Sequence, residues 1–258
     1  MKKIIVCLCV SRALLWADEV MDIIAQECVK RYYPQVVSIS DNQVLLKNGN
    51  SFVWDDGKRK DYDEMILSPD MNDAFTYPYP FSGNVTNRNE DTSRIRHLGF
   101  YKAIYGENEE EVKEHLVQVP WFKEYFNESF IVVTSANGVD KAFERVIQRL
   151  SNIQQAYYQF LSDQDAFYWR TIADSPNLSP HSFGIALDIN TQFSKYWLWD
   201  KKERNEYQYE NQIPLEIVRA FEEEGFIWGG RWWHYDTMHF EYRPEIICYA
   251  KNLQQLNK

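Results

Sequence analysis

The spacing of hydrophobic residues predicts a helix followed by a small β-meander at the start of the chain. Apolar residues stand at positions 20, 23, 24 and 28, which is the spacing of one helix face. Three short strand-like runs then lie between 35 and 62, separated at Asp41-Asn42 and at Asn48-Gly49. The second pair is a strong signal for a tight turn, so we expect a meander.

The segment 68–95 is rich in Pro, Asn, Asp and Ser and has no sustained period. It is expected to be a long loop or crossing segment, and a domain boundary could fall within it. Helical spacing begins again in "EEEVKEHLVQVPWF", residues 109–122, which predicts a helix there.

Alternating and compact apolar runs in the second half predict several short strands between helices. The expected strands are 129–135, 184–190, 225–230 and 237–242, and the expected helices are 139–150 and 214–225. Strands and helices in this irregular order indicate an α+β fold. We expect a small, mainly antiparallel sheet with flanking helices, in addition to the N-terminal meander.

Composition suits a globular protein and argues against nucleic acid as a partner. Of the 258 residues 45% are hydrophobic and 26% are charged, enough for one sizeable domain or one domain with an appendage. The formal net charge is -10, and the basic surface that nucleic-acid binding needs is not expected at such a charge.

The N-terminus has the layout of a secretory signal peptide. Two lysines precede an apolar stretch of about a dozen residues, and Ala17 precedes a charged pair. The apolar stretch is too short to span a bilayer, so we expect a cleaved leader over 1–17, export to the periplasm or the outside, and no membrane span in the mature chain. The alternative is an ordinary buried segment. After cleavage Cys28 and Cys248 would remain, which allows one disulfide without requiring it.

Histidine is scarce, with five in the chain, and one of these lies in the segment "SPHSFGIALDIN", residues 179–190. On a strand the side chains alternate, so the apolar residues at 185, 187 and 189 go to the core and Asp188 points the other way. Gly184 allows a bend that would fold His181 back over the strand. His181 and Asp188 can therefore converge on one point.

A second segment, "WWHYDTMHFEY", residues 232–242, follows the same logic. Met238, Phe240 and Tyr242 form the expected core face, while His239 lies on the polar face with Thr237 and Glu241. If the two strands are neighbours, His181, Asp188 and His239 have the composition of a catalytic zinc site.

Asp236 lies close enough to this group to act as general base without being a ligand. Each motif alone is more often a packed histidine or a carboxylate that braces a turn. Their occurrence together favours a metal site.

These motifs resemble the zinc peptidases of the D-alanyl-D-alanine carboxypeptidase and L-alanyl-D-glutamate endopeptidase family. The family pattern is SxHxxGxAxD, followed later by an acid, two residues and a histidine. The matching residues are Ser179, His181, Gly184, Ala186, Asp188, Asp236 and His239. The resemblance implies a fold like that of these peptidases and of the related hedgehog signalling domain.

The resemblance also implies the roles of individual residues. His181, Asp188 and His239 would bind Zn²⁺, Asp236 would be the catalytic base, and an arginine upstream of the first motif would contact the substrate. Arg170 fills that position, and a guanidinium can stabilise an oxyanion. Ser179 is expected to line the substrate site.

The residues that precede Asp236 are less specific. His234 and Tyr235 are candidates to hydrogen-bond the oxyanion or a substrate carboxylate, with packing as the alternative for His234. Trp232 and Trp233 are expected to form the wall of the cleft.

We therefore expect a zinc peptidase domain over 116–258 that cleaves peptidoglycan stem peptides, preceded by a region, 18–115, to which no chemistry is assigned. Asp rather than Glu at position 236 favours the L-alanyl-D-glutamate endopeptidase. The alternatives are a D-alanyl-D-alanine carboxypeptidase and a non-catalytic, zinc-stabilised cell-wall binding module. The sequence carries no signal for an oligomeric state.

Overall fold

The computed structural model describes residues 18–173, 175–204 and 208–256, so the expected leader over 1–17 lies outside it. The N-terminal part contains a helix over 18–32 and an antiparallel three-stranded meander, as the hydrophobic pattern predicts. Its strands and the helices that follow are β1 (Val36–Ser40), β2 (Gln43–Leu46), β3 (Ser51–Val53), α2 (Tyr62–Leu67), α3 (Leu98–Tyr105) and α4 (Glu109–Lys113).

The segment 68–95 is a long connection, as expected, with three short 3₁₀ turns along it. The prediction of a helix over 109–122 is wrong for the second half of that segment. Helix α4 ends at Lys113, and Leu116–Pro120 forms strand β4, which pairs antiparallel with β5 (Phe130–Thr134). Leu116, Val117 and Val119 satisfy a helical period by spacing alone, but a neighbouring strand provides ladder hydrogen bonds that favour the extended form.

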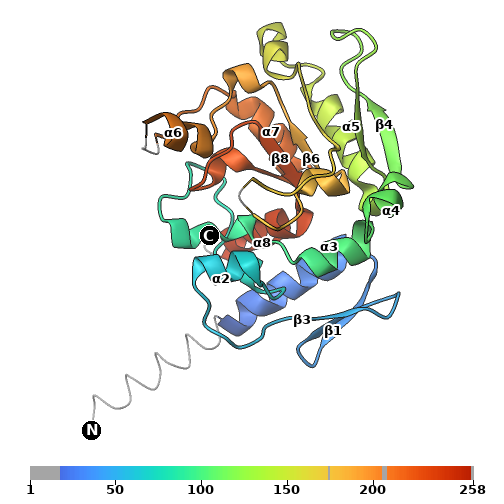
Figure 1. Ribbon diagram of the computed structural model, residues 1–258, viewed down its shortest axis with the longest axis vertical. Coiled ribbons are helices and arrows are strands. Elements are labelled where there is room, and N and C mark those ends of the chain that lie inside the picture. Colours follow the sequence, from blue (N-terminus) through green and yellow to red (C-terminus); the bar gives the residue numbers. More distant parts are fainter. Residues whose placement is uncertain (1–17, 174, 205–207, 257–258) are drawn as a thin grey trace.

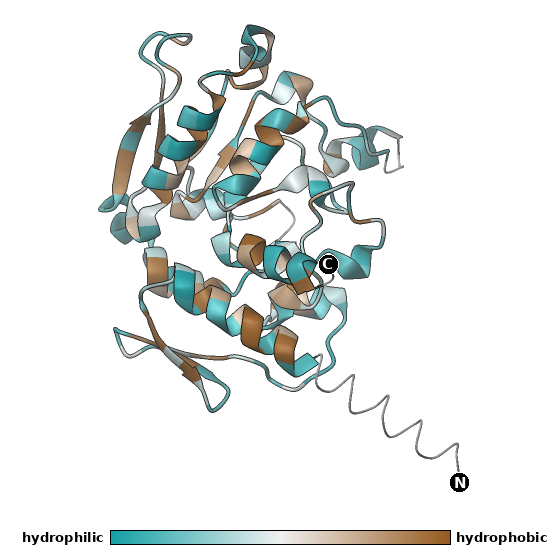
Figure 2. Cartoon of the chain, turned by 180° about the vertical axis from the view of Figure 1, so that it is seen from behind, coloured by the Kyte–Doolittle hydropathy of each residue, from teal (hydrophilic) through white to brown (hydrophobic). Residues whose placement is uncertain are grey.

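Helix α5 (Val139–Leu150) packs against this two-stranded sheet through the face that its sequence pattern predicts. The buried residues of that face are Val139, Ala142, Phe143, Val146 and Leu150. Figure 2 shows brown hydrophobic and teal hydrophilic residues sharing the same helices, as expected of helices with one buried and one exposed face.

A second three-stranded sheet lies near the middle of the molecule, beside helix α7 (Leu215–Glu223) (Figure 1). Its antiparallel order is β6-β8-β7, with β6 at Ala186–Asp188, β8 at His239–Tyr242 and β7 at Phe226–Trp228. Gly225 follows α7 at a φ of 95°, the left-handed conformation expected of a residue that ends a helix. The remaining helices are α6 (Trp197–Arg204) and α8 (Pro244–Leu256). The fold is therefore α+β, with small antiparallel sheets.

The N-terminal part is joined to the C-terminal part by buried polar contacts and a disulfide. The Tyr79 hydroxyl donates to Glu222 at 2.7 Å, and the Tyr33 hydroxyl donates to Glu245 at 3.0 Å. Cys28 in the N-terminal helix is bonded to Cys248 in α8. Buried apolar residues from Ala25 to Ala250 form one core cluster, and the division at 115/116 stays a prediction.

Among the described residues, none of the helices is both long enough and apolar enough to cross a membrane.

Candidate active site

Strand register places Asp188 and His239 directly opposite each other. Asp188 is the last residue of β6 and His239 the first of β8, and their Cα atoms are partners in the antiparallel ladder. Ile185, Leu187 and Ile189 are fully buried in the core, as alternation predicts. The Asp188 side chain therefore projects from the opposite face, where its Oδ1 lies 2.9 Å from His239 Nδ1.

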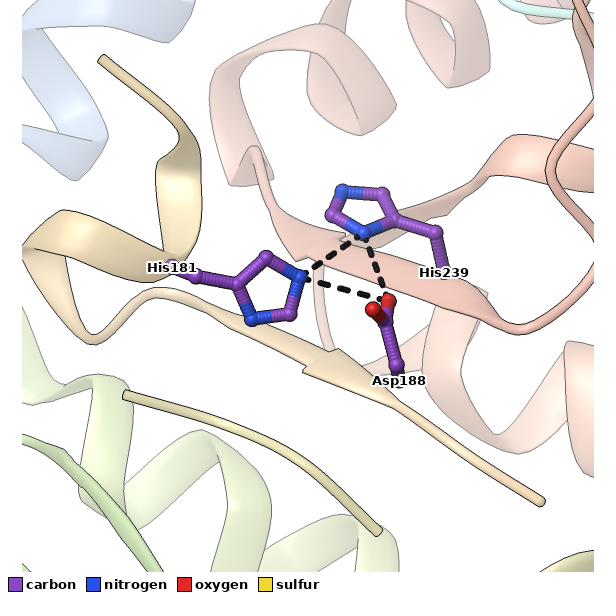
Figure 3. Close-up of side chains that lie close together, drawn as sticks. All are labelled: His181, Asp188 and His239. Carbon is purple, nitrogen blue, oxygen red and sulfur yellow. Dashed lines mark hydrogen bonds and ion pairs between the residues drawn. The ribbon is translucent and has the colours of Figure 1, made fainter. Parts of the chain in front are cut away.

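His181 reaches the same point from a 3₁₀ turn over Pro180–Phe183. The turn ends at Gly184, whose φ of 65° is left-handed and whose missing Cβ would lie 2.8 Å from the Thr134 backbone nitrogen. His181 Nδ1 lies 2.5 Å from the Ala166 carbonyl oxygen, which fixes it as the donor. Nε2 is thereby left as the acceptor nitrogen, and Figure 3 shows it directed at Asp188 and His239.

The three side chains are spaced as the ligands of a single metal ion would be. His181 Nε2 lies 3.3 Å from Asp188 Oδ1 and 3.2 Å from His239 Nδ1. Ligand atoms at about 2.0–2.1 Å from a tetrahedral zinc ion are separated by about 3.3 Å, so one ion can contact all three. These residues also form a group whose ligand atoms all lie within 4.8 Å of one another.

Electrostatics at the cluster favours a bound cation. Burial raises the pKa of Asp188, but His181 and His239 outweigh it and hold that pKa well below its usual range. Burial lowers the pKa of His239, but hydrogen bonds with Asp188 and Glu241 outweigh it and raise the pKa to about 9. The cluster thus stabilises a positive charge, which a proton or a metal ion can supply.

Asp236 lies beside the cluster and lines the same cavity. Its loop is closed by a bond from the Asp236 backbone nitrogen to the Gly229 carbonyl at 3.0 Å, and a Cβ at Gly229 would collide with the Asp236 carbonyl oxygen. No described residue hydrogen-bonds the buried Oδ1 of Asp236. Burial and, next, the charge of Asp188 raise its pKa to about 7, a value suited to a general base near neutral pH.

Arg170 and Ser179 also line this cavity, whose volume is about 240 Å³. The backbone of Arg170 is held by two neighbours in the motif: its carbonyl accepts from the Ser179 backbone nitrogen at 2.9 Å, and its nitrogen donates to Ser182 Oγ at 2.9 Å. Ser179 caps the 3₁₀ turn and accepts from the His181 nitrogen at 3.4 Å. These bonds fix where the arginine enters the cavity.

His234 forms part of the wall, between two aromatic rings. It stacks on Tyr62 at 6.2 Å and meets Trp197 edge-on at 4.6 Å. Burial and, next, the charge of Arg94 lower its pKa to about 3, so its ring is neutral at pH 7. The Tyr235 hydroxyl instead donates to Asp200 and to the Gln208 carbonyl at 3.0 Å, and Tyr235 does not line the cavity.

Met238 is buried, as expected, and it also lines the cavity just before β8 begins at His239. Trp232 lines the cavity as predicted, with its ring centre 5.5 Å from that of His239.

Sequence reasoning missed Arg94, Arg96 and Asp91, all from the region to which it assigned no chemistry. Both arginines line the cavity, and Asp91 accepts a hydrogen bond from the Trp233 backbone nitrogen at 3.1 Å. Strand alternation in the sequence places Glu241 on the polar face of its strand but assigns it no role. In the structure Glu241 binds Arg96 and lies 3.6 Å from His239 Nε2. Spacing in the sequence could have indicated only Glu241, which is two residues from a ligand on the same strand face.

Comparison with protein families agrees with this geometry. Residues 173–242 match the family described as D-alanyl-D-alanine carboxypeptidase. The resemblance that the two motifs indicate is thereby confirmed over this segment, which contains the three metal-ligand candidates and Asp236. Arg170 lies just before the match, and Arg94 and Arg96 lie far outside it. No curated protein and no solved structure matches the chain. The match and the cluster together support a hydrolase of the zinc-peptidase type.

Proposed function

We propose that this protein is an exported zinc peptidase that cleaves the peptide stems of bacterial peptidoglycan, as an L-alanyl-D-glutamate endopeptidase. One observation carries the proposal: two imidazoles and a carboxylate converge with metal-ligand spacing in the same cavity as a buried carboxylate whose Oδ1 has no described partner. The match to a peptidase family over 173–242 supports it.

His181, Asp188 and His239 are the residues that would hold the zinc ion. When bound there, zinc supplies Lewis-acid polarisation of the scissile carbonyl and acidifies the attacking water. Asp236 takes a proton from that water and passes it to the nitrogen of the leaving amine. The Arg170 guanidinium, a planar cation with several N–H donors, stabilises the oxyanion of the tetrahedral intermediate.

An aspartate as the base at position 236 favours the endopeptidase, because several family members that cut between L-Ala and D-Glu carry Asp there. The second candidate is a D-alanyl-D-alanine carboxypeptidase, which is the activity named in the description of the matched family. A non-catalytic binding module is the third, and it is disfavoured because a module without activity has no need of Asp236 and Arg170 in one cavity.

Export is supported by two features. The first 17 residues have the composition of a leader, and Cys28 is bonded to Cys248 across the molecule. Structural disulfides persist in oxidising compartments and are rare in the cytosol. An exported enzyme would meet peptidoglycan directly.

Digestion of purified cell wall by the zinc-loaded protein tests this function. New termini identified by mass spectrometry separate the candidates: a new N-terminal D-Glu supports the endopeptidase, and released D-alanine supports the carboxypeptidase. The His239→Ala variant is the control, since it lacks a metal ligand. A zinc-loaded, folded protein that releases neither product would contradict the proposal.

A further inference from the structure

The N-terminal region contributes an arginine to the wall of the active-site cavity. Arg94 ends a 3₁₀ turn over Thr92–Arg94 and lines the cavity together with Arg170 and the metal-ligand cluster. The residues around it are anchored, since Asp91, Thr92, Ser93 and Ile95 are all buried. In the sequence, this part of the chain lies far before the segment 173–242 that matches the peptidase family.

Arg94 forms no ion pair within 4 Å with a carboxylate among the described residues, although the buried carboxylate of Asp91 is close enough for the two charges to stabilise each other. Its guanidinium lies 5.4 Å from the centre of the Trp232 ring, and Nη1 lies 3.4 Å from the neutral hydroxyl of Tyr62. Its Nε is buried and hydrogen-bonds none of the described residues. Arg94 is therefore held between aromatic rings, and some of its N–H donors have no hydrogen-bond partner among the described residues.

Arg96, two residues further on, provides a contrast in the same cavity. Its Nε lies 2.8 Å and 3.0 Å from the two carboxylate oxygens of Glu241, so its charge is already paired. Arg170 is assigned to the oxyanion. Of the three arginines that line this cavity among the described residues, Arg94 has neither a direct ion pair nor an assigned role, so its donors remain for another group of the substrate.

The position of Arg94 also places it along the path of a bound peptide. A second cavity of about 110 Å³ adjoins the first and shares four of its lining residues, including Arg94 and Arg96. Apolar side chains, among them Ile66, Leu98 and Phe183, line the far part of this second cavity. A peptide that extends from the metal-ligand cluster into it would pass Arg94.

We propose that Arg94 binds the free α-carboxylate of the D-glutamate that follows the scissile bond, an inference that rests on the proposed function. In a stem peptide D-Glu is linked through its γ-carboxyl, so its α-carboxylate is free and lies next to the nitrogen of the bond that is cut. A guanidinium matches a carboxylate in charge and in its two-pronged geometry. The corresponding α-carboxamide, isoglutamine, would lose the charge and one acceptor and would bind less well.

Two synthetic peptides test this assignment: N-acetyl-L-Ala-γ-D-Glu-L-Lys-amide and the same peptide with the α-carboxamide. They differ in a single carboxylate. Binding is measured by calorimetry on the zinc-loaded Asp236→Ala variant, which cannot turn them over, and hydrolysis is measured on the zinc-loaded parent enzyme. We expect the carboxylate peptide to bind more tightly by about 10- to 100-fold, as for a charge-assisted pair.

Arg94→Gln should remove this preference, raising KM for the carboxylate peptide and leaving the carboxamide peptide nearly unaffected. Arg88→Gln is the matched control: Arg88 lies in the same segment and also contacts the Tyr62 ring, but it is half-exposed, pairs with Asp63 and does not line the cavity. It should keep the full preference. Equal binding of the two peptides, or an equal loss for both in Arg94→Gln, would overturn the assignment. Selective binding without cleavage would leave the assignment standing and contradict the proposed function.

Discussion

Arg96 and Glu241, 145 residues apart in sequence, form a buried ion pair behind a metal-ligand candidate. Burial raises the pKa of Glu241, but Arg96 outweighs it and holds that pKa well below its usual range. The resulting carboxylate lies 3.6 Å from His239 Nε2. It thereby orients the ring so that Nδ1 faces the cluster, as carboxylates behind metal-bound histidines commonly do.

Glu241→Gln should weaken zinc binding without abolishing it. The amide keeps the shape but loses the charge that supports His239, and such changes typically cost about 10- to 100-fold in metal affinity. Competition with a chelator of known affinity measures the change. Glu245→Gln is the matched control, because Glu245 is also a buried glutamate paired with an arginine, Arg243, but its contacts are with Arg243 and Tyr33 and not with a metal-ligand candidate. Equal zinc affinity in Glu241→Gln and the parent would contradict this role.

Asp236→Ala should abolish hydrolysis and leave zinc binding stoichiometric. Asp236 lines the cavity but is not among the three residues whose ligand atoms converge, so its loss removes the base and not a ligand. General-base catalysis contributes about 10²- to 10⁴-fold, and the rate should fall by at least that much. Hydrolysis of cell wall and metal content are measured on the same preparation. His239→Ala is the contrasting variant and should lose the metal. Loss of zinc from Asp236→Ala would mean that Asp236 is a ligand.

The metal cluster was predictable from the sequence because its geometry depends on local rules. Strand alternation puts Asp188 and His239 on one face of their strands, and the left-handed Gly184 folds His181 over that face. What the sequence left conditional was whether the two strands are neighbours. The register answers this, with Asp188 directly opposite His239.

Other parts of the site depend on long-range packing that no local pattern records. Arg94 and Arg96 reach the cavity because a segment without periodicity crosses to the sheet, and nothing in its spacing points to His239. The pairing of Cys28 with Cys248 spans 220 positions and is likewise set by how two helices pack. The spacing over 109–122 predicts a helix where β4 lies, because the sequence alone does not show that β5 pairs with this segment and favours the extended form.

Asp91→Asn should change how the stability of the protein depends on pH. Asp91 is fully buried, and burial raises its pKa to about 6, against about 3.9 in the unfolded chain. Between these values the folded state keeps a proton that the unfolded state has lost. Its contribution to stability is therefore full below about pH 4 and is lost as the pH rises through 6, by about 3 kcal/mol at most.

Asparagine does not titrate and keeps an oxygen that can accept from the Trp233 backbone nitrogen. The free energy of unfolding of Asp91→Asn, relative to the parent, should thus increase between pH 4 and pH 7. Urea denaturation at both values measures it. A difference that stays constant or decreases over this range would show that Asp91 is not the titrating group.

Removing the disulfide between Cys28 and Cys248 should lower the stability of the folded protein. Cys28 and Cys248 join the N-terminal helix to α8, and the bond closes a long loop whose entropy would otherwise favour the unfolded chain. Replacing both cysteines with serine should lower the free energy of unfolding by about 2–5 kcal/mol, and Tm by about 2–4 °C for each kcal/mol. Thermal melts of the two proteins measure the difference.

A reducing agent should lower the Tm of the parent and leave that of the double variant unchanged. Reaction of Cys28 and Cys248 with a thiol reagent in the unreduced protein would contradict the pairing, because an intact disulfide leaves neither of them free to react.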